Sequence, residues 1–271
     1  MYESAASGNF RPYLAAKLPL NCVGNVEVGE TLFTESRLRR AEVEIRMNIP
    51  ARGNGEIPDS RSYFRHYDRV LSELPHGQVE LAADKLNDVY EEGRRVFIFG
   101  NGGSAALASH FACDLGKGTA MPCSSHKRFK AMSLTDNMPL LTAWANDTSY
   151  EQVFAEQLRN FVQPGDIAFA ISGSGNSPNI LLGLDAAREA GAFNIGLAGF
   201  NGGKMKPLCD LCIVIPSDNM QIIEDLHVSV SHALFTLVRH RIQIRSAKVR
   251  TMAASAHATS AIPSSLRMCP T

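Results

Sequence analysis

Histidines and carboxylates with the spacing of an acid–base site occur in two segments of the chain. His110 and Asp114 are four residues apart in a stretch with helical periodicity, so their side chains share one helix face. His232 lies in a second helical stretch, five residues after His227. Imidazole and carboxylate groups transfer protons and also ligate divalent metals, so these residues are candidates for catalysis or metal binding. His227 is equally compatible with a core histidine or with a helper of His232.

Two glycine- and serine-rich segments have the composition of anion-binding loops. The first is Gly100–Ser104, and the second runs from Ser172 to Pro178. Each is expected to join the end of a strand to the start of a helix, where backbone N–H groups and the helix dipole favour negative charge. Tight turns would also explain either segment, but two such loops at equivalent strand ends favour phosphate binding. The candidate ligand-binding residues are Asn101, Gly102, Gly103, Ser104, Ser172, Ser174 and Ser177.

The elements that must position these residues alternate between strand and helix. Short segments that are apolar on both faces predict buried parallel strands. They are 95–99, 129–134, 167–172, 193–198 and 211–216. The intervening helices are predicted at 103–116, 137–146, 150–162, 178–190 and 221–241, after two helices within 60–93 that Pro75 separates. The fold class is therefore α/β, with a doubly wound, mainly parallel five-stranded sheet flanked by helices.

Three motifs in this order resemble the SIS (sugar isomerase) domain family. They are GNGGS after the first strand, SGSGNS after a central strand, and Gly202-Gly203-Lys204 before the last strand. The resemblance covers about residues 60–242, implies a flavodoxin-like topology, and is closest to the bacterial phosphoheptose isomerase branch. It implies a cytoplasmic enzyme of heptose biosynthesis that converts sedoheptulose 7-phosphate to a D-glycero-heptose 7-phosphate by enediol proton transfer.

The resemblance also implies a zinc site and assigns catalytic roles. The implied metal ligands are His110, Asp114, Glu224 and His232. The acidic residue at 114 would be the base, and His232 would be the acid. Two further residues, Asn146 and Asp147, are implied to contact the substrate.

This sequence departs from the branch at two of the four metal positions. Asp114 stands where the branch has a longer Glu, and Glu224 stands where it has a neutral Gln. Glu224 and His232 are also eight residues apart, which is about 12 Å along a continuous helix. They could share one ion only if Glu224 preceded the helix or a second subunit supplied part of the site. The main alternative is therefore a non-catalytic SIS module that binds a sugar phosphate or a protein partner, as a replication-initiator-associated member of the branch does.

Composition argues against several other classes of protein. Lys plus Arg and Asp plus Glu both number 27, so the chain lacks the net positive charge of a nucleic-acid binder. No apolar run approaches the roughly 20 residues that cross a bilayer, and the N-terminus does not resemble a signal peptide. Cys209-x-x-Cys212 straddles the start of a predicted strand and has no second pair, so it does not predict a redox or zinc motif.

Segments at both ends of the chain fall outside the predicted domain. The last helix of that domain indicates assembly with further copies of the chain. Residues 1–59 are expected to form an N-terminal extension and residues 243–271 a C-terminal tail, both disordered. On the predicted helix 221–241, apolar residues cover most of the circumference, which suggests burial on more than one side. We therefore expect a homodimer or homotetramer with sites lined by two chains, as the resemblance implies for the tetramer.

Overall fold

The computed structural model of the chain describes residues 57, 59–120 and 127–260. Most of the predicted extension 1–59 and the end of the predicted tail, 261–271, lie outside these described residues.

The centre of the fold is a five-stranded parallel sheet in the order β2-β1-β3-β4-β5. This arrangement confirms the predicted doubly wound sheet. The strands are β1 Arg95–Gly100, β2 Lys130–Ser133, β3 Ile167–Ser172, β4 Phe193–Ala198 and β5 Leu211–Val214. The chain reverses its direction of winding between β1 and β3, which pair from Val96 with Ile167 to Gly100 with Ile171. Ligands of open α/β sheets bind at the carboxyl ends of the strands beside such a point, and both glycine-rich loops begin there.

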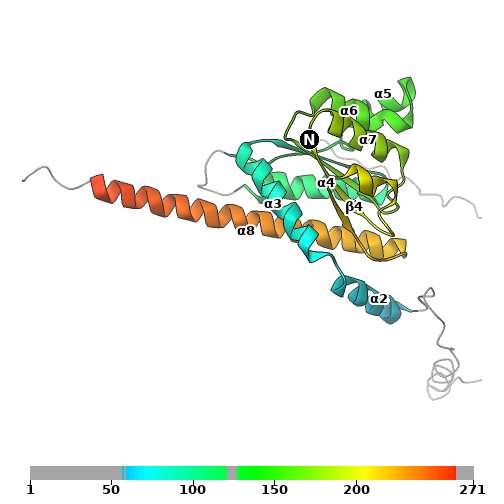
Figure 1. Cartoon of the computed structure of the whole chain (residues 1–271), viewed down its shortest axis with the longest axis horizontal. Helices are drawn as coiled ribbons and strands as arrows, with labels where there is room; N and C mark the ends of the chain where they lie inside the picture. The colour runs from blue at the N-terminus through cyan, green and yellow to red at the C-terminus, as the bar shows by residue number, and fades with distance from the viewer. Residues whose placement is uncertain (1–56, 58, 121–126, 261–271) are drawn as a thin grey trace, which may run out of the picture. The chain divides into compact units, whose positions relative to one another are not determined.

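Helices cover both faces of the sheet (Figure 1). One face packs against α3, α4 and α8, and the other packs against α6 and α7, so the central strands β1, β3 and β4 are buried on both sides. The α-helices are α2 Ser60–Ser72, α3 His76–Glu92, α4 Gly103–Cys113, α5 Met138–Asp147, α6 Val153–Phe161, α7 Pro178–Glu189 and α8 Met220–Ser260. The shorter helices are η1 Asp114–Gly118, η2 Tyr150–Gln152 and η3 Gly203–Leu208.

Local sequence sets several of the helix ends. Asp59 caps α2 by accepting a hydrogen bond from the Ser62 N–H at 2.7 Å. Pro75 separates α2 from α3, as predicted, and Gly93 ends α3 in the left-handed conformation with φ of 67°.

The last helix differs from its prediction. It was expected at 221–241, with an unpatterned tail after residue 243, but α8 begins at Met220 and continues to Ser260. The segment after residue 243 is rich in alanine, which has the highest helix propensity, so it is helical without an apolar stripe. Periodicity detects a helix only where one face is buried, and Ile242 is the last buried residue among those of α8 whose burial the structure describes.

His227 lies on the buried face of α8 and is 1% exposed. Burial disfavours the charged imidazolium and lowers the pKa of His227 to about 4, from its ordinary value of 6.5. This location agrees with the interpretation of His227 as a core histidine.

Acid should therefore destabilise the protein through His227. The unfolded chain takes up a proton at the ordinary pKa, whereas the folded chain stays neutral until about pH 4. Stability contributed by the neutral ring is complete above about pH 6.5 and falls by about 3 kcal/mol as the pH drops to about 4. Urea unfolding across this range should show the decrease. His227→Met should flatten that part of the pH profile, whereas His240→Met on the exposed side of α8 should leave it intact. An unchanged profile in the His227 variant would contradict the assignment.

Candidate active site

Three of the predicted metal ligands come together between α4 and α8. Asp114 Oδ2 lies 3.6 Å from His110 Nε2 and 3.9 Å from His232 Nε2. The two imidazole Nε2 atoms are 3.4 Å apart. Both histidine side chains are 50% exposed and that of Asp114 is 24% exposed, so a ligand can reach all three.

Asp114 lies where α4 passes into a π-helical turn, and its N–H still donates to the His110 carbonyl as in a regular α-helix. The predicted helix 103–116 becomes π-helical at Asp114, and η1 then continues to Gly118. Such turns occur frequently at functional sites. An added Cβ at Gly118 would lie 2.5 Å from the Phe235 ring, so any larger residue would have to displace this ring of α8. This close contact holds Asp114 beside His232.

The cluster fits a divalent metal such as zinc. The ligand atoms of His110, Asp114 and His232 all lie within 4.8 Å of one another. Two imidazoles and one carboxylate are a donor set that zinc accepts, with a fourth position open for another ligand.

Glu224 does not join this cluster within the chain. Because α8 begins at Met220, Glu224 lies inside the helix and is separated from His232 by the expected helical rise of about 12 Å. Its carboxylate lies at the start of α4, 3.5 Å from the position of a Cβ on Gly103. There it lines a cavity of about 220 Å³ together with Ser104 and His227.

The first glycine-rich loop is tied to α7. Asn101 Nδ2 donates to Asn179 Oδ1 at 2.8 Å, and Asn179 Nδ2 donates back to Asn101 Oδ1 at 2.9 Å. The Tyr150 hydroxyl also donates to Asn101 Oδ1 at 3.0 Å. Gly102, with φ of 56°, is the N-cap of α4, so the first N–H groups of that helix follow it. Asn101 therefore positions the loop, while Gly102, Gly103 and Ser104 stand at the start of α4.

The serine-rich loop is held by its own hydroxyl groups. Ser172 Oγ accepts a hydrogen bond from the Gly175 N–H at 3.1 Å, and Ser174 Oγ accepts one from the Asn176 N–H at 3.3 Å. Ser177 is the N-cap of α7, and within the described part of the chain its side chain makes no capping hydrogen bond. Its hydroxyl is thus positioned at the positive end of the helix without capping it.

A second loop closes on the serine-rich loop from the side of β4. The Met205 N–H donates to the Gly175 carbonyl at 2.9 Å, and the Lys204 N–H donates to Asn176 Oδ1 at 3.1 Å. Gly175 has φ of 64°, and a Cβ there would lie 2.2 Å from the Gly202 carbonyl oxygen. The Gly202-Gly203-Lys204 motif therefore braces the serine-rich loop.

Two residues of α2 were missed by sequence reasoning. His66 and Arg69 line a cavity of about 750 Å³ together with Ser174 and Asn176. His66 and Arg69 are three residues apart and therefore share one helix face, but this spacing does not predict which other element that face contacts. A cation beside the serine-rich loop suits an anionic ligand.

Asn146 and Asp147 end α5, as predicted, and both are exposed. Asn146 Nδ2 donates to Asp147 Oδ1 at 2.9 Å.

Similarity to known proteins agrees with this fold. The SIS domain profile matches residues 62–199, and the chain belongs to the SIS domain family. It is 43% identical over 157 residues to phosphoheptose isomerase of Rhodospirillum rubrum, covering 58% of this chain and 82% of that protein. It is 37% identical over 166 residues to that of Akkermansia muciniphila, covering 61% and 86%. The structure of a phosphoheptose isomerase from Francisella tularensis superimposes with a TM-score of 0.62 at 28% identity, covering 66% of this chain and 96% of that one.

Gly175→Ala should destabilise the protein, because the added Cβ would collide with the Gly202 carbonyl. The left-handed φ and the clash with Gly202 together should cost at least about 2 kcal/mol in the free energy of unfolding. The matched control is Gly77→Ala in α3, where an added Cβ would meet no described atom within 4 Å. That change should be neutral or stabilise by up to about 1 kcal/mol. Urea denaturation measures both, and equal stabilities of the Gly175 variant and the parent would refute the close loop contact.

Proposed function

We propose that the chain is an aldose–ketose isomerase of a phosphorylated seven-carbon sugar, converting sedoheptulose 7-phosphate to a D-glycero-heptose 7-phosphate. The observation that carries the proposal is the Asp114 carboxylate facing two imidazoles in a SIS domain. Relatives named phosphoheptose isomerase support the choice of substrate.

Phosphate recognition is assigned to the serine-rich loop. Ser177 stands at the positive end of α7. The hydroxyl oxygens of Ser172 and Ser174 accept hydrogen bonds from loop N–H groups, which leaves their hydroxyl protons to donate to a phosphate. Arg69 lines the adjoining cavity and contributes positive charge. These groups would fix one end of the sugar and thereby orient its carbonyl end.

Proton transfer is assigned to the residues between α4 and α8. Asp114 would take a proton from the carbon next to the carbonyl, and His232 would give a proton to the carbonyl oxygen, which produces the enediol. Returning the proton to the neighbouring carbon, while the other hydroxyl loses its proton, completes the exchange of ketose and aldose. Since Asp114 and His232 are 3.9 Å apart, both can contact adjacent atoms of one substrate.

Zinc is proposed as the cofactor of this site. His110, Asp114 and His232 would hold the ion, and Glu224 of a second subunit would complete the set of four. A bound zinc ion would polarise the sugar oxygens as a Lewis acid.

Assembly into a homotetramer, or at least a homodimer, accompanies this proposal. Large apolar side chains remain exposed on α2, α3 and α8, including Phe64 at 65%, Leu81 at 55% and Val228 at 37%. Exposed apolar patches commonly mark interfaces. Glu224 and His232 cannot bind one ion within one chain. A site shared by two chains would explain this separation and also the exposed apolar side chains.

We also place the enzyme in the cytoplasm. None of the helices in the described ranges is long and apolar enough to cross a membrane.

The alternative function is a non-catalytic SIS module that binds a sugar phosphate or a protein partner. It is favoured by the carboxylate of Glu224 at the start of α4, because a negative group there competes with an anionic ligand for the positive end of the helix. The shorter Asp114 side chain also favours it, since a misplacement of about 1 Å can cost a hundredfold in rate.

The direct test is incubation with sedoheptulose 7-phosphate and detection of the aldose product. His232→Ala should lower kcat by about 10²- to 10⁴-fold with a small change in KM, since a proton-transfer group acts mainly in the transition state. His240→Ala, at an exposed position on the same helix, is the matched control and should retain activity. Binding of the sugar phosphate without turnover in the parent protein would instead favour the non-catalytic module.

A shared site predicts complementation between two inactive variants. Mixed oligomers of His232→Ala and Glu224→Ala chains should regain activity, because some sites then combine an intact cluster from one chain with an intact Glu224 from the other. Mixing His232→Ala with Asp114→Ala is the control, because both residues belong to one cluster and no complete site can form. Differently tagged chains, co-purified through both tags, would provide the mixed oligomers. A monomer in light scattering, or no recovery in the first mixture, would refute sharing.

A further inference from the structure

Two cysteine thiols lie together at the edge of the sheet. Cys209 follows η3 and Cys212 lies in β5, and both are partly exposed. An added Cβ at Gly196 would lie 2.7 Å from Cys209 Sγ and 3.1 Å from Cys212 Sγ. The missing side chain of Gly196 thus leaves one small space that both sulfurs occupy.

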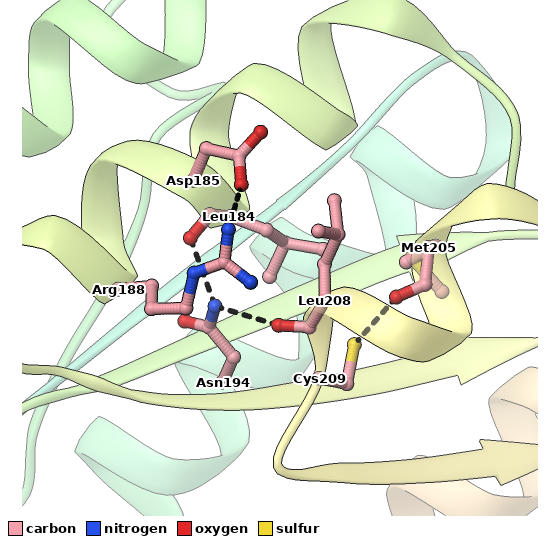
Figure 2. Close-up of polar contacts among 7 residues, drawn as sticks. All are labelled: Leu184, Asp185, Arg188, Asn194, Met205, Leu208 and Cys209. Carbon is pink, nitrogen blue, oxygen red and sulfur yellow. Dashed lines mark hydrogen bonds and ion pairs between the residues drawn. The ribbon is translucent and has the colours of Figure 1, made fainter.

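The backbone around Cys209 is fixed on both sides by Asn194 of β4. Asn194 Nδ2 donates to the Leu208 carbonyl at 3.0 Å and to the Leu184 carbonyl at 2.8 Å (Figure 2). The Asn194 N–H donates to Asp210 Oδ2 at 2.7 Å. Because the residues before and after Cys209 are anchored, its thiol stays beside that of Cys212.

The same thiol is connected to the serine-rich loop. Cys209 Sγ donates to the Met205 carbonyl at 3.3 Å, which is visible in Figure 2. The Met205 N–H in turn donates to the Gly175 carbonyl. A change at Cys209 therefore affects η3, the segment whose hydrogen bond to Gly175 holds the serine-rich loop.

We propose that Cys209 and Cys212 are a redox-active pair that small disulfides, such as oxidised glutathione, convert reversibly to an intramolecular disulfide. The sequence alone did not predict this, because the positions straddle the start of a strand and the shared space beside Gly196 appears only in the fold.

The exchange proceeds in two balanced steps. The Cys212 thiolate attacks one sulfur of the small disulfide, which forms a mixed disulfide and releases one small thiolate. The Cys209 thiol then loses its proton to solvent and attacks the Cys212 sulfur, and the second small thiolate leaves. The two cysteines are oxidised by two electrons, and one small disulfide is reduced to two thiols.

The surroundings favour Cys212 as the attacking group. When Cys212 ionises, the single proton of the Cys209 thiol turns from the Met205 carbonyl to the Cys212 sulfur. This hydrogen bond lowers the pKa of Cys212, and the charge of Lys206 acts in the same direction. The same hydrogen bond, together with burial, raises the pKa of Cys209. The thiolate, which is the nucleophile, therefore forms at Cys212.

Oxidation removes the hydrogen bond from Cys209 to Met205, since a disulfide sulfur carries no proton. The segment η3 then loses one of the hydrogen bonds that fix Met205. The contact of Met205 with Gly175 becomes weaker, and the serine-rich loop is less well held. This consequence rests on the proposed function, because it assumes that the loop binds the sugar phosphate. The disulfide itself does not.

The test equilibrates the full-length protein with mixtures of reduced and oxidised glutathione, followed by alkylation and mass spectrometry. When oxidised glutathione is in excess, the peptide containing both cysteines should lose two alkylation sites and two hydrogens, and reduction should restore them. In Cys209→Ser, Cys212 should instead retain glutathione, because no second thiol resolves the mixed disulfide. Cys113→Ser, at an exposed cysteine of α4, is the control and should form the disulfide like the parent.

Calorimetry with sedoheptulose 7-phosphate then compares the reduced and oxidised forms. We expect about fivefold weaker binding after oxidation, as the loop loses preorganisation. Full alkylation of both cysteines, or glutathione on Cys212 of the parent, would overturn the redox pair. Equal affinities of the two forms would overturn its connection to the loop. If the reduced protein fails to bind the sugar phosphate, the proposed function fails, and the alkylation result still decides the redox pair.

Discussion

The contact between Gly175 and Gly202-Gly203 is the constraint on which the ligand-binding edge of the sheet depends. Loops from the neighbouring strands β3 and β4 meet backbone to backbone, and a Cβ on Gly203 would lie 2.5 Å from the Ser174 carbonyl oxygen. The contact fixes the direction of the serine-rich loop as it enters α7. It also sets the position of η3, and through η3 that of Cys209. One steric condition therefore governs both the anion-binding loop and the thiol pair.

A second close approach arranges the proton-transfer residues. Gly118 lets η1 lie against Phe235, and the first residue of η1, Asp114, lies beside His232 of α8. His110 and Asp114 share one helix face, since the Asp114 N–H donates to the His110 carbonyl, and their position relative to His232 depends on how this helix packs against α8. The chemistry thus relies on close packing between two helices.

Sequence reasoning succeeded where a local pattern determines structure. Buried parallel strands are continuous apolar segments, so all five were found within a few residues of their observed limits. Pro75 and the glycine-rich motifs also gave reliable boundaries.

Features that depend on tertiary contacts could not be derived in this way. The π-helical turn at Asp114, the position of Glu224 near Gly103 and the cation that α2 brings to the serine-rich loop all require knowledge of which helix meets which. The extent of α8 was missed for the opposite reason, because its last part is encoded by propensity rather than by a buried stripe.

The reciprocal amide pair between Asn101 and Asn179 has a thermodynamic consequence. It joins the first glycine-rich loop to the helix that follows the serine-rich loop, so the two loops form one rigid unit before any ligand arrives. The conformational entropy of ordering them is lost when the chain folds and not when a ligand binds. Association of a small anion here should therefore proceed with little rearrangement of the backbone, and differences in affinity between ligands should reflect their direct contacts.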